Sequence, residues 1–214
     1  MRLPGLVLAT WLIMALAGVM PWLEPNRVSL PEIFMLPSTA HWLGTDELGR
    51  PVLDRLLSGA GVSLLVALTT VVVSAVIGIT VGLTAGYFGG LTDRVISRLI
   101  EVFLAFPGML LAIAMAAMIG PGIDNVIIAL ATMGWVGYAR LVRVQVLSLR
   151  EREHVLAAVA LGRTDLAIMQ RHLLPLVMAP IWVEASFGVA GAVVAEAGLS
   201  CLGLGIQPPD ASWG

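Results

Sequence analysis

The 214-residue sequence contains no lysine, a single cysteine (Cys201) and few charged residues of either sign. Charged residues make up 12% of the chain and hydrophobic residues 58%, with a mean hydropathy of +0.95. This composition excludes an ordinary soluble domain. The lone cysteine excludes an internal disulfide, and its apolar surroundings favour a packed side chain over a reactive thiol. The formal net charge of −2 gives no indication of nucleic-acid binding, and no nucleic-acid partner is expected.

The chain contains several long apolar stretches with few charged residues. A helix needs about 20 apolar residues to cross a bilayer, and lipid cannot satisfy open backbone groups, so each stretch is expected to be helical. The sequence therefore predicts an all-α, polytopic transmembrane helical bundle. The five predicted spans are Leu3–Trp22, Ser63–Gly86, Leu99–Ile119, Asn125–Ala139 and Leu176–Leu199.

The first stretch has two interpretations. Arg2, an apolar run and a possible cleavage site at Ala15-Leu16-Ala17 are typical of a signal peptide. The apolar run continues to Trp22, however, and more predicted spans follow, which favours an uncleaved anchor. Both interpretations place the N-terminus inside.

The arginines are spread unevenly over the predicted loops, which indicates an orientation. Cytoplasmic loops carry an excess of basic residues, so the arginine-rich side is expected to be inside. This predicts an inside N-terminus, an inside loop over 140–175 and an outside Gly214. The inner loops hold Arg2, Arg94, Arg98, Arg140, Arg143, Arg150, Arg152, Arg163 and Arg171, and the outer loops hold Arg27, Arg50 and Arg55.

The predicted spans divide the chain into three parts: a transmembrane helix at 1–22, an extracytoplasmic loop at 23–62 and a transmembrane domain at 63–214. Four prolines in or beside the first half of the loop predict irregular structure there. Its last part has helical periodicity and predicts a short interfacial helix. His41 lies near Asp46 and Glu47, but three possible ligands in a flexible loop are weak support for a metal site, and no metal or cofactor is expected.

The inner loop predicts a helix, a turn and a second helix. Ser148 and Glu151 have the spacing of a capping box, which predicts that a helix begins there. Val155, Ala158, Val159 and Gly162 then fall on one face at helical spacing. Ala157 and Ala158 keep this helix slender, so that another surface can approach closely.

The second half of the same loop contains the turn. Gly162 is suited to ending the first helix in a left-handed conformation. Thr164 or Asp165 can cap a second helix over Leu166–Leu173, and Pro175 either ends it or begins the next span. On these features alone a docking loop and a plain helical hairpin remain equally acceptable.

Three blocks then carry a resemblance to a known family. They are HWLGTDELGR at His41–Arg50, the loop with Ala157-Ala158, Gly162 and Leu174-Pro175, and EAGLSCLGLGIQPPDASWG at Glu196–Gly214. In order and spacing they resemble the C-type permease subunit of type I ABC importers for dipeptides, oligopeptides or nickel. The block at Gly44, Thr45, Asp46, Gly49 and Arg50 is similar to the family's outer element.

The chain also departs from the family pattern. Leu156 stands where the coupling loop commonly has glutamate, Pro51 follows the outer element in place of an acidic residue, and Cys201 replaces a common phenylalanine. The family pattern continues past Gly214 into one more span. From this we expect a chain that lacks its last span and is inactive in transport as it stands; the alternative is a permease with five spans.

The resemblance implies a transport subunit in a bacterial inner membrane. Its expected partners are a second permease subunit in a heterodimer, two ATP-binding subunits, an extracytoplasmic substrate-binding protein and the lipid bilayer. The chain has no glycine-rich phosphate loop, so it is not expected to hydrolyse ATP itself. The coupling residues implied by the resemblance are Glu153, Ala157, Ala158, Gly162, Asp165, Leu174 and Pro175.

Charged residues within the predicted spans are candidates for function. Glu101 follows Arg98 by three residues, which predicts a helical ion pair and a role in orientation. Glu184 is deep and has no evident partner. For Glu196, helix packing and pathway lining both remain open.

Two other classes of protein compete with this reading. A membrane-embedded enzyme would need a nucleophile and a base facing each other within the spans, yet all three histidines fall outside them. A secondary transporter or channel would leave the docking-like loop without a purpose.

Overall fold

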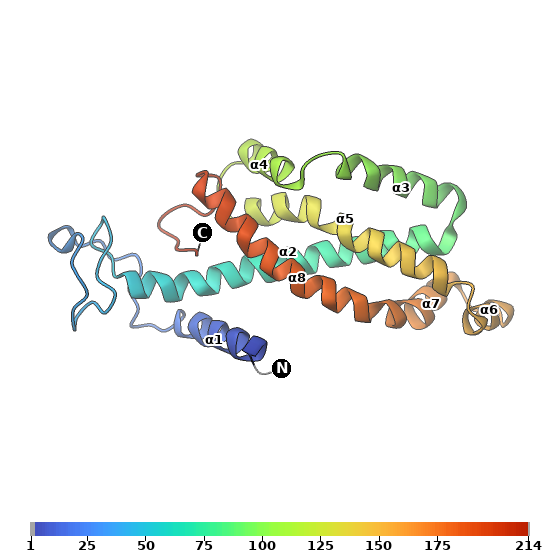
Figure 1. The fold of residues 1–214 in the computed structure, drawn as a ribbon, viewed down its shortest axis with the longest axis horizontal. Helices are drawn as coiled ribbons and strands as arrows, with labels where there is room; N and C mark the ends of the chain where they lie inside the picture. The colour runs from blue at the N-terminus through green and yellow to red at the C-terminus, as the bar shows by residue number, and fades with distance from the viewer. Residues whose placement is uncertain (1–2, 214) are drawn as a thin grey trace.

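The computed structural model describes residues 3–213 and is helical with no strand among those residues, which confirms the predicted fold class. Helices α2, α5 and α8 lie along one long axis, and α3 and α4 cover one side of them (Figure 1). The helices are α1 Leu3–Ala17, η1 Leu30–Glu32, α2 Val52–Phe88, α3 Gly90–Leu104, α4 Gly108–Ile119, α5 Ile123–Leu149, α6 Glu153–Ala160, α7 Asp165–Ile168, η2 Met169–Leu173 and α8 Leu174–Cys201.

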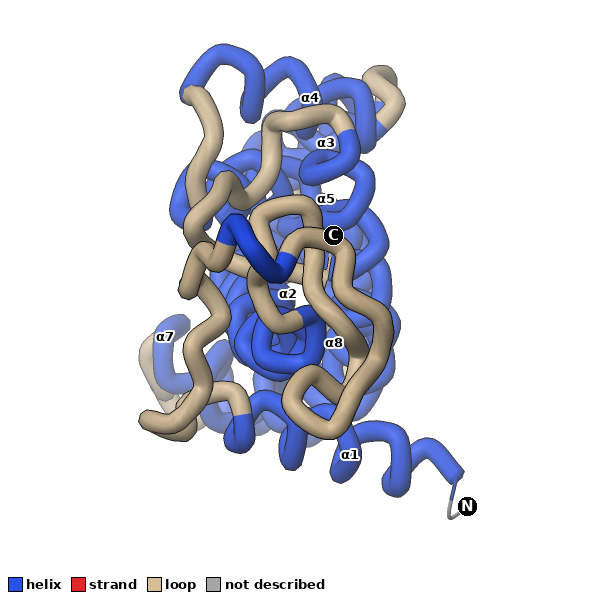
Figure 2. The backbone as a smooth tube through the Cα atoms, turned by 90° about the vertical axis from the view of Figure 1, so that its left-hand side faces the viewer, coloured by secondary structure: helices blue, strands red, loops and turns tan. Residues whose placement is uncertain are grey.

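The two ends of the bundle differ. Helices α6 and α7 project from one end, and the irregular residues 23–51 lie at the other (Figure 1). Seen along the bundle, loops from this second end cover the helices, and the C-terminal segment lies among them (Figure 2). Consecutive long helices therefore run in alternating directions, as a polytopic membrane protein requires.

Three helices within residues 3–213 are long and apolar enough to cross a membrane: α2, α5 and the continuous helix Asp165–Cys201. They contain the predicted second, fourth and fifth spans. Helix α1 covers part of the predicted first span but is shorter, with 15 residues.

The predicted third span, Leu99–Ile119, is not one straight helix. Helices α3 and α4 are bent by 83° at a short break and could form one broken span. Pro107 explains the break, because it lacks an N–H and disfavours helical geometry at the residue before it. Helix α3 accordingly ends at Leu104, and α4 begins directly after Pro107.

The predicted interfacial helix is also wrong as a separate element. Residues from Val52 onward form the first turns of α2, which continues without interruption to Phe88. Nothing between Leu57 and Ser63 breaks the helix, and Gly59 has a packing purpose. A Cβ at Gly59 would lie 3.1 Å from the backbone of Ser212, so glycine lets the C-terminal segment lie directly on α2.

The tightest helix contact is between α2 and α5, and small residues permit it. Gly78, Gly82 and Gly86 recur every four residues on the face of α2 that meets α5. A Cβ at Gly82 would lie 2.6 Å from the carbonyl oxygen of Ala139. In lipid, where the hydrophobic effect does not drive helix association, such close backbone approach supplies much of the packing.

Candidate functional site

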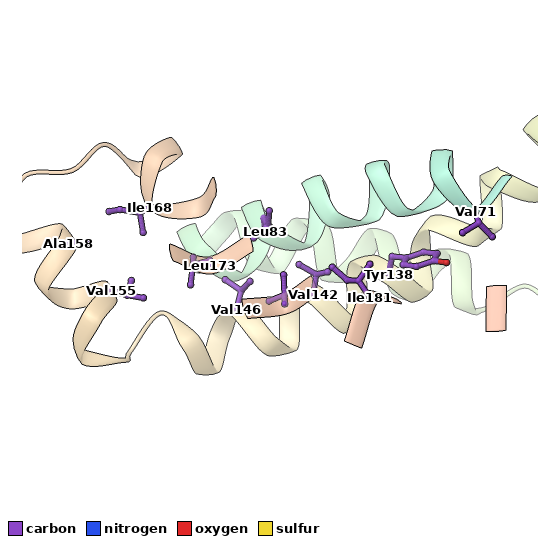
Figure 3. Close-up of a cluster of buried hydrophobic side chains, with 11 residues drawn as sticks. Val71, Leu83, Tyr138, Val142, Val146, Val155, Ala158, Ile168, Leu173 and Ile181 are labelled. Atoms are coloured by element: carbon purple, nitrogen blue, oxygen red, sulfur yellow. The ribbon is translucent and has the colours of Figure 1, made fainter. Parts of the chain in front are cut away.

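Helices α6 and α7 form a hairpin whose inner face continues the core of the bundle. Val155 and Ala158 of α6 are buried against Ile168 and Leu173 of the returning helix. The same cluster includes residues of α2, α5 and α8, whose side chains are drawn in Figure 3. The hairpin is therefore packed onto the bundle and does not hang from it as a loose loop.

The turn of the hairpin follows the sequence prediction. Gly162 has φ 74°, the left-handed geometry that favours glycine. The N–H of Gly162 donates to the carbonyl of Val159 at 2.9 Å, and the N–H of Arg163 to that of Ala158 at 3.1 Å, so the last carbonyls of α6 have partners. Thr164 caps α7, since its Oγ1 accepts from the N–H of Ala167 at 3.4 Å.

The beginning of α6 differs from the prediction. Helix α5 continues through Ser148 to Leu149, so no capping box forms, and α6 begins at Glu153 after Arg152 without a side-chain cap. The second helix begins at Asp165 and passes through the π-helix η2 directly into α8. Pro175 thus lies at the start of α8, directly after η2 and inside the continuous helix Asp165–Cys201, where it has no N–H to donate to the preceding turn.

The four residues that the helical spacing placed on one face of α6 are divided between the core and the surface. Ala158 is only 5% exposed, so it packs inward. Val159 and Gly162 lie outward instead, because the core of the bundle takes the face that carries Val155. Ala157 is exposed and remains available to a partner. The exposed large apolar side chains are Leu156, Val159, Leu161 and Leu166.

The remaining predicted residues of the loop also have defined places. Glu153 is exposed at the start of α6, and Leu174 is half-buried at the start of α8. Asp165 accepts a hydrogen bond of 2.7 Å from the hydroxyl of Tyr87, at the end of α2. The hairpin is thereby tied to a helix almost 80 positions earlier in the chain.

Two arginines, Arg143 in α5 and Arg150 directly after it, bind the other helices at this end of the bundle. Arg143 forms a bidentate ion pair with Asp93 of α3, with Nη2 2.8 Å from Oδ2. Arg150 donates to the carbonyl of Gly86 in α2 at 3.2 Å. A paired arginine fork fixes orientation as well as distance. Helices α2, α3, α5 and the hairpin are therefore linked where the hairpin joins the bundle.

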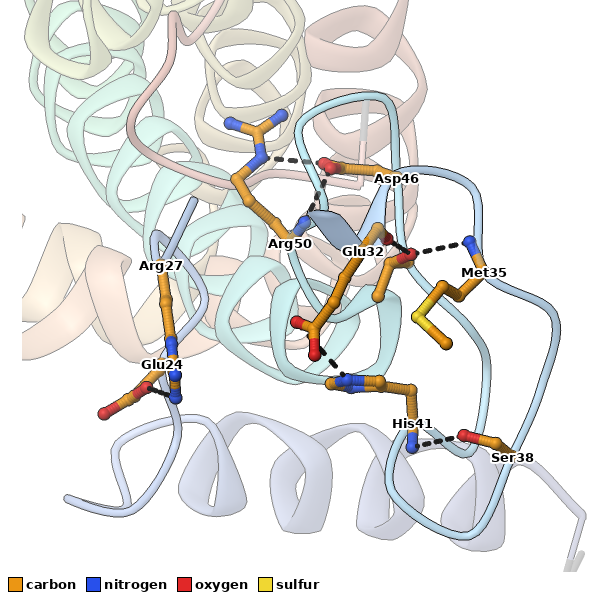
Figure 4. A network of polar contacts seen from close by, with 9 residues as sticks. Glu24, Arg27, Glu32, Met35, Ser38, His41, Asp46 and Arg50 are labelled. Atoms are coloured by element: carbon orange, nitrogen blue, oxygen red, sulfur yellow. Dashed lines mark hydrogen bonds and ion pairs between the residues drawn. The ribbon is translucent and has the colours of Figure 1, made fainter. Parts of the chain in front are cut away.

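At the opposite end, hydrogen bonds and ion pairs hold the outer element in a compact loop structure, which we call the outer knot (Figure 4). The name refers to these contacts and not to a threaded chain. Thr45 is 7% exposed; its Oγ1 donates to the carbonyl of Glu32 and accepts from the N–H of Met35 at 2.9 Å. Asp46 accepts from the N–H groups of Leu48 and Arg50, each at 2.9 Å. The bonds of Thr45 hold the stretch around Glu32 and Met35 against the outer element, and those of Asp46 close the turn that follows it.

Gly44 and Gly49 complete the knot because both have positive φ, at 74° and 71°. A Cβ at Gly49 would also collide with the carbonyl of Ser29. The residues of the outer element thus stabilise the fold of segment 23–51 through contacts within the chain. His41 lies beside Glu32, with Nε2 3.7 Å from Oε2, and is not brought together with Asp46 in a metal site.

The carboxylate of Asp46 is the electrostatic centre of this knot. Burial alone would raise its pKa, but the backbone N–H groups of Arg50 and Leu48 and the guanidinium of Arg50 together bring the pKa below its ordinary value. Arg50 lies with Nε 2.7 Å from Oδ2, and Arg55 lies at 3.7 Å. Asp46 is therefore held as an anion that organises the loop.

The three charged candidates in the spans differ in environment. Glu101 forms the predicted exposed ion pair with Arg98, at 2.8 Å. Glu196 is 1% exposed and accepts hydrogen bonds from Ser200 at 3.0 Å and Ser63 at 3.4 Å. Because Ser63 in turn accepts from the N–H of Trp213 at 3.0 Å, this arrangement favours a packing role for Glu196.

Glu184 is half-buried on α8 and lies between two cavities. One, of about 420 Å³, is an open cavity lined by residues of α2, α4, α5 and α8, among them Thr70 and Tyr138. The other, of about 340 Å³, lies under the end of α3 and includes Arg140. The break between α3 and α4 runs over both cavities, since Leu104 lines one and Gly108 the other.

Sequence reasoning missed the contacts that join distant segments. The pairs Asp93–Arg143 and Tyr87–Asp165, and the bond from Arg150 to Gly86, carry no local signal. The recurrence of glycine at 78, 82 and 86 was the one visible sign of a close helix contact. The cavity beside Tyr138 could not be found from spacing, because four helices contribute to it.

Comparisons with known proteins agree with this architecture. Residues 78–214 match the family described as the binding-protein-dependent transport system inner membrane component. The dipeptide transport system permease protein DppC of Bacillus subtilis is 43% identical over 218 residues, covering the whole of this chain and 68% of the relative. A putative peptide transport system permease protein of Brucella suis is 44% identical over 214 residues, covering 98% of this chain and 71% of the relative. The DppC protein of Alkalihalophilus pseudofirmus is 44% identical over 83% of this chain and 59% of its own length.

Proposed function

The chain belongs to the family of binding-protein-dependent transport system inner membrane components, and from this premise we propose that it is the permease subunit of an ATP-driven importer of dipeptides or oligopeptides. Relatives named as dipeptide and peptide transport permeases align over nearly its whole length and support the substrate class. In this proposal the chain forms half of the translocation pathway and has no ATPase site of its own.

The α6–α7 hairpin carries the proposal, because its exposed apolar face has no partner within residues 3–213. Leu161 is 82% exposed and Leu156 is 55% exposed, at the end of the bundle opposite the outer knot. Exposed apolar side chains grouped on an ordered element mark a docking surface. We assign this face to a cytoplasmic ATP-binding subunit, with Ala157 and Gly162 allowing close approach.

The contacts behind the hairpin explain how force would pass into the membrane. The buried cluster around Val155 and Leu173 makes the hairpin continuous with the bundle, so it cannot move independently of the helices beneath it. Tyr87 ties it to α2 through Asp165, and α8 continues directly from it. Movement of the docked ATP-binding subunit would therefore shift α2 and α8 together and change access to the pathway.

The proposed assembly contains this chain, a second permease subunit, two ATP-binding subunits and an extracytoplasmic binding protein, in a bacterial inner membrane. The proposed orientation has the N-terminus and the hairpin in the cytoplasm. Arginines at the hairpin end of the bundle support this orientation through the positive-inside rule. They are Arg94, Arg98, Arg140, Arg143, Arg150, Arg152, Arg163 and Arg171.

Cysteine labelling tests this orientation in intact cells. Glu47 and Arg163 are both exposed, at opposite ends of the bundle. In a Cys201→Ser background, Glu47→Cys should react with a membrane-impermeant maleimide, and Arg163→Cys should react only after the cells are opened. Labelling of Arg163→Cys in sealed cells would show that the hairpin lies outside and cannot meet a cytoplasmic ATP-binding subunit.

Reconstitution tests the function itself. The permease, coproduced with candidate ATP-binding subunits, a second permease subunit and a binding protein, should copurify with the ATP-binding subunits and import a radiolabelled dipeptide into proteoliposomes only with ATP and binding protein. Leu161→Glu should abolish copurification, because it places a charge on the docking face. The matched control Leu36→Glu lies in the segment 23–51 at the opposite end of the bundle, where Leu36 is 83% exposed, and should leave copurification intact. Import without ATP would favour a secondary transporter instead.

A further inference from the structure

Residue Glu184 raises a question that helix packing does not answer. Its carboxylate lies within a membrane-crossing helix, and within residues 3–213 it forms no ion pair within 4.0 Å, even though Arg140 lines one of the same cavities. A carboxylate at membrane depth is costly unless it is paired or opens onto a polar pathway. Glu196, on the same helix, shows the contrast, because two serine hydroxyls satisfy it.

The cavity beside Glu184 contains further polar groups without partners. Thr70 and Tyr138 are each 4% exposed, and neither the Oγ1 of Thr70 nor the hydroxyl of Tyr138 has a hydrogen-bond partner. Buried polar groups are nearly always satisfied, so two orphaned hydroxyls lining one cavity indicate a missing polar partner. Glycine keeps the space open, since a Cβ at Gly188 would lie 2.8 Å from the Tyr138 hydroxyl.

Size and composition indicate the class of ligand. The cavity of about 420 Å³ lies within the range of small-ligand sites. Its lining combines one carboxylate and two hydroxyls with apolar side chains such as Met109 and Met133. A carboxylate selects a cation, the hydroxyls suit neutral amide groups, and methionine adapts to varied side chains.

We infer that this cavity is a binding site on the translocation pathway, where Glu184 holds the cationic amino group of a short peptide and Tyr138 and Thr70 hydrogen-bond its amide groups. The inference rests on the proposed function and specifies it further by naming the residues that meet the substrate. The break between α3 and α4, where the two helices are bent by 83°, lies next to Glu184, since Gly108 and Leu104 line the cavities that contain it.

Photocrosslinking in the whole transporter tests the site directly. A tripeptide with a free amino terminus and a central benzoylphenylalanine is delivered by the binding protein to the permease–ATPase complex, irradiated and mapped by mass spectrometry. Benzophenones react readily with methionine, so adducts are expected on Met109 or Met133. Met118, on α4 like Met109, is 84% exposed and lies outside the cavity, so it should stay unlabelled.

Variants separate binding by Glu184 from a merely structural role. Glu184→Gln keeps the shape but removes the charge and should lower the adduct yield by about tenfold, whereas Glu184→Asp should retain most of it. Glu101→Gln, the same change at an exposed ion pair, should have no effect. Copurification with the ATP-binding subunits shows whether each variant is assembled.

The outcomes for the site and for the function are distinguishable. If the parent complex imports no peptide at all, the proposed function is wrong. If it imports peptide but the adducts fall only outside the cavity, or if Glu184→Gln labels as strongly as the parent, the assignment of Glu184 is overturned and the function stands.

Discussion

Replacing Gly162 tests the hairpin at the point where its geometry is most demanding. Gly162 has φ 74°, and a Cβ built there has no heavy atom of another residue within 4 Å. A substitution therefore meets open space, and its cost comes from the backbone alone. Left-handed geometry costs most residues about 1–2 kcal/mol, and a strained β-branched residue about 1–3 kcal/mol.

The chemistry of the replacement should therefore matter more than its size. Gly162→Asn should remain close to the parent, because asparagine tolerates left-handed geometry. Docking of the ATP-binding subunit should be intermediate for Gly162→Ala and weakest for Gly162→Val. A cost of about 1–3 kcal/mol corresponds to a loss of about 5- to 150-fold in the population of the docking-competent hairpin.

The assay measures how much ATP-binding subunit copurifies per permease, together with ATP-dependent peptide import. Both should fall in the order Gly, Asn, Ala, Val while the amount of permease in the membrane stays constant. Asparagine and valine both add a branched set of heavy atoms, so equal losses for the two would mean that the exposed surface matters and the backbone does not. Full docking by Gly162→Val would refute the turn as a requirement for coupling.

Three further changes follow from single contacts. The folded-state pKa of Asp46 lies below its ordinary value of about 3.9. The carboxylate therefore stabilises the outer knot fully above about pH 3.9, and this stabilisation is lost as the pH falls through the folded-state pKa. Proteolysis of residues 23–51 should accordingly increase over that pH range in the parent, and Asp46→Asn should abolish this pH dependence. Glu196→Ala should destabilise the detergent-solubilised permease by about 1–3 kcal/mol, because Ser63 loses its acceptor, and an unchanged melting temperature would contradict its packing role. Tyr87→Phe should lower import per ATP hydrolysed but spare ATPase copurification, since only the bond to Asp165 is lost; unchanged coupling would show that this bond transmits nothing.

The features that the sequence predicted well are those encoded by neighbouring residues. Apolar composition and run length determined the class of protein and the approximate positions of the long helices, because the bilayer requires length and apolarity. Gly162 was identified correctly as the turn, and Thr164 was one of the two residues predicted to cap the second helix, because both roles depend on the local backbone. The ion pair between Arg98 and Glu101 was predicted for the same reason.

Local signals failed where a distant segment decides between two acceptable conformations. The capping-box spacing at Ser148 was overridden because α5 continues and Arg150 reaches across to Gly86. The face of α6 could not be assigned from periodicity, since both Ala157 and Ala158 suit a slender helix and only the core of the bundle determines that Ala158 points inward.

By itself, then, the sequence determined a polytopic helical membrane protein with an ordered hairpin in an arginine-rich loop. The tertiary structure decided that α2 is one helix, that the third predicted span is broken at Pro107, and that the outer element is a knot around Asp46. It also decided that Glu184, alone among the acidic residues of α8, faces a cavity. A cavity and a knot are made by segments far apart in the chain, and their formation depends on which faces pack together, which no local pattern encodes.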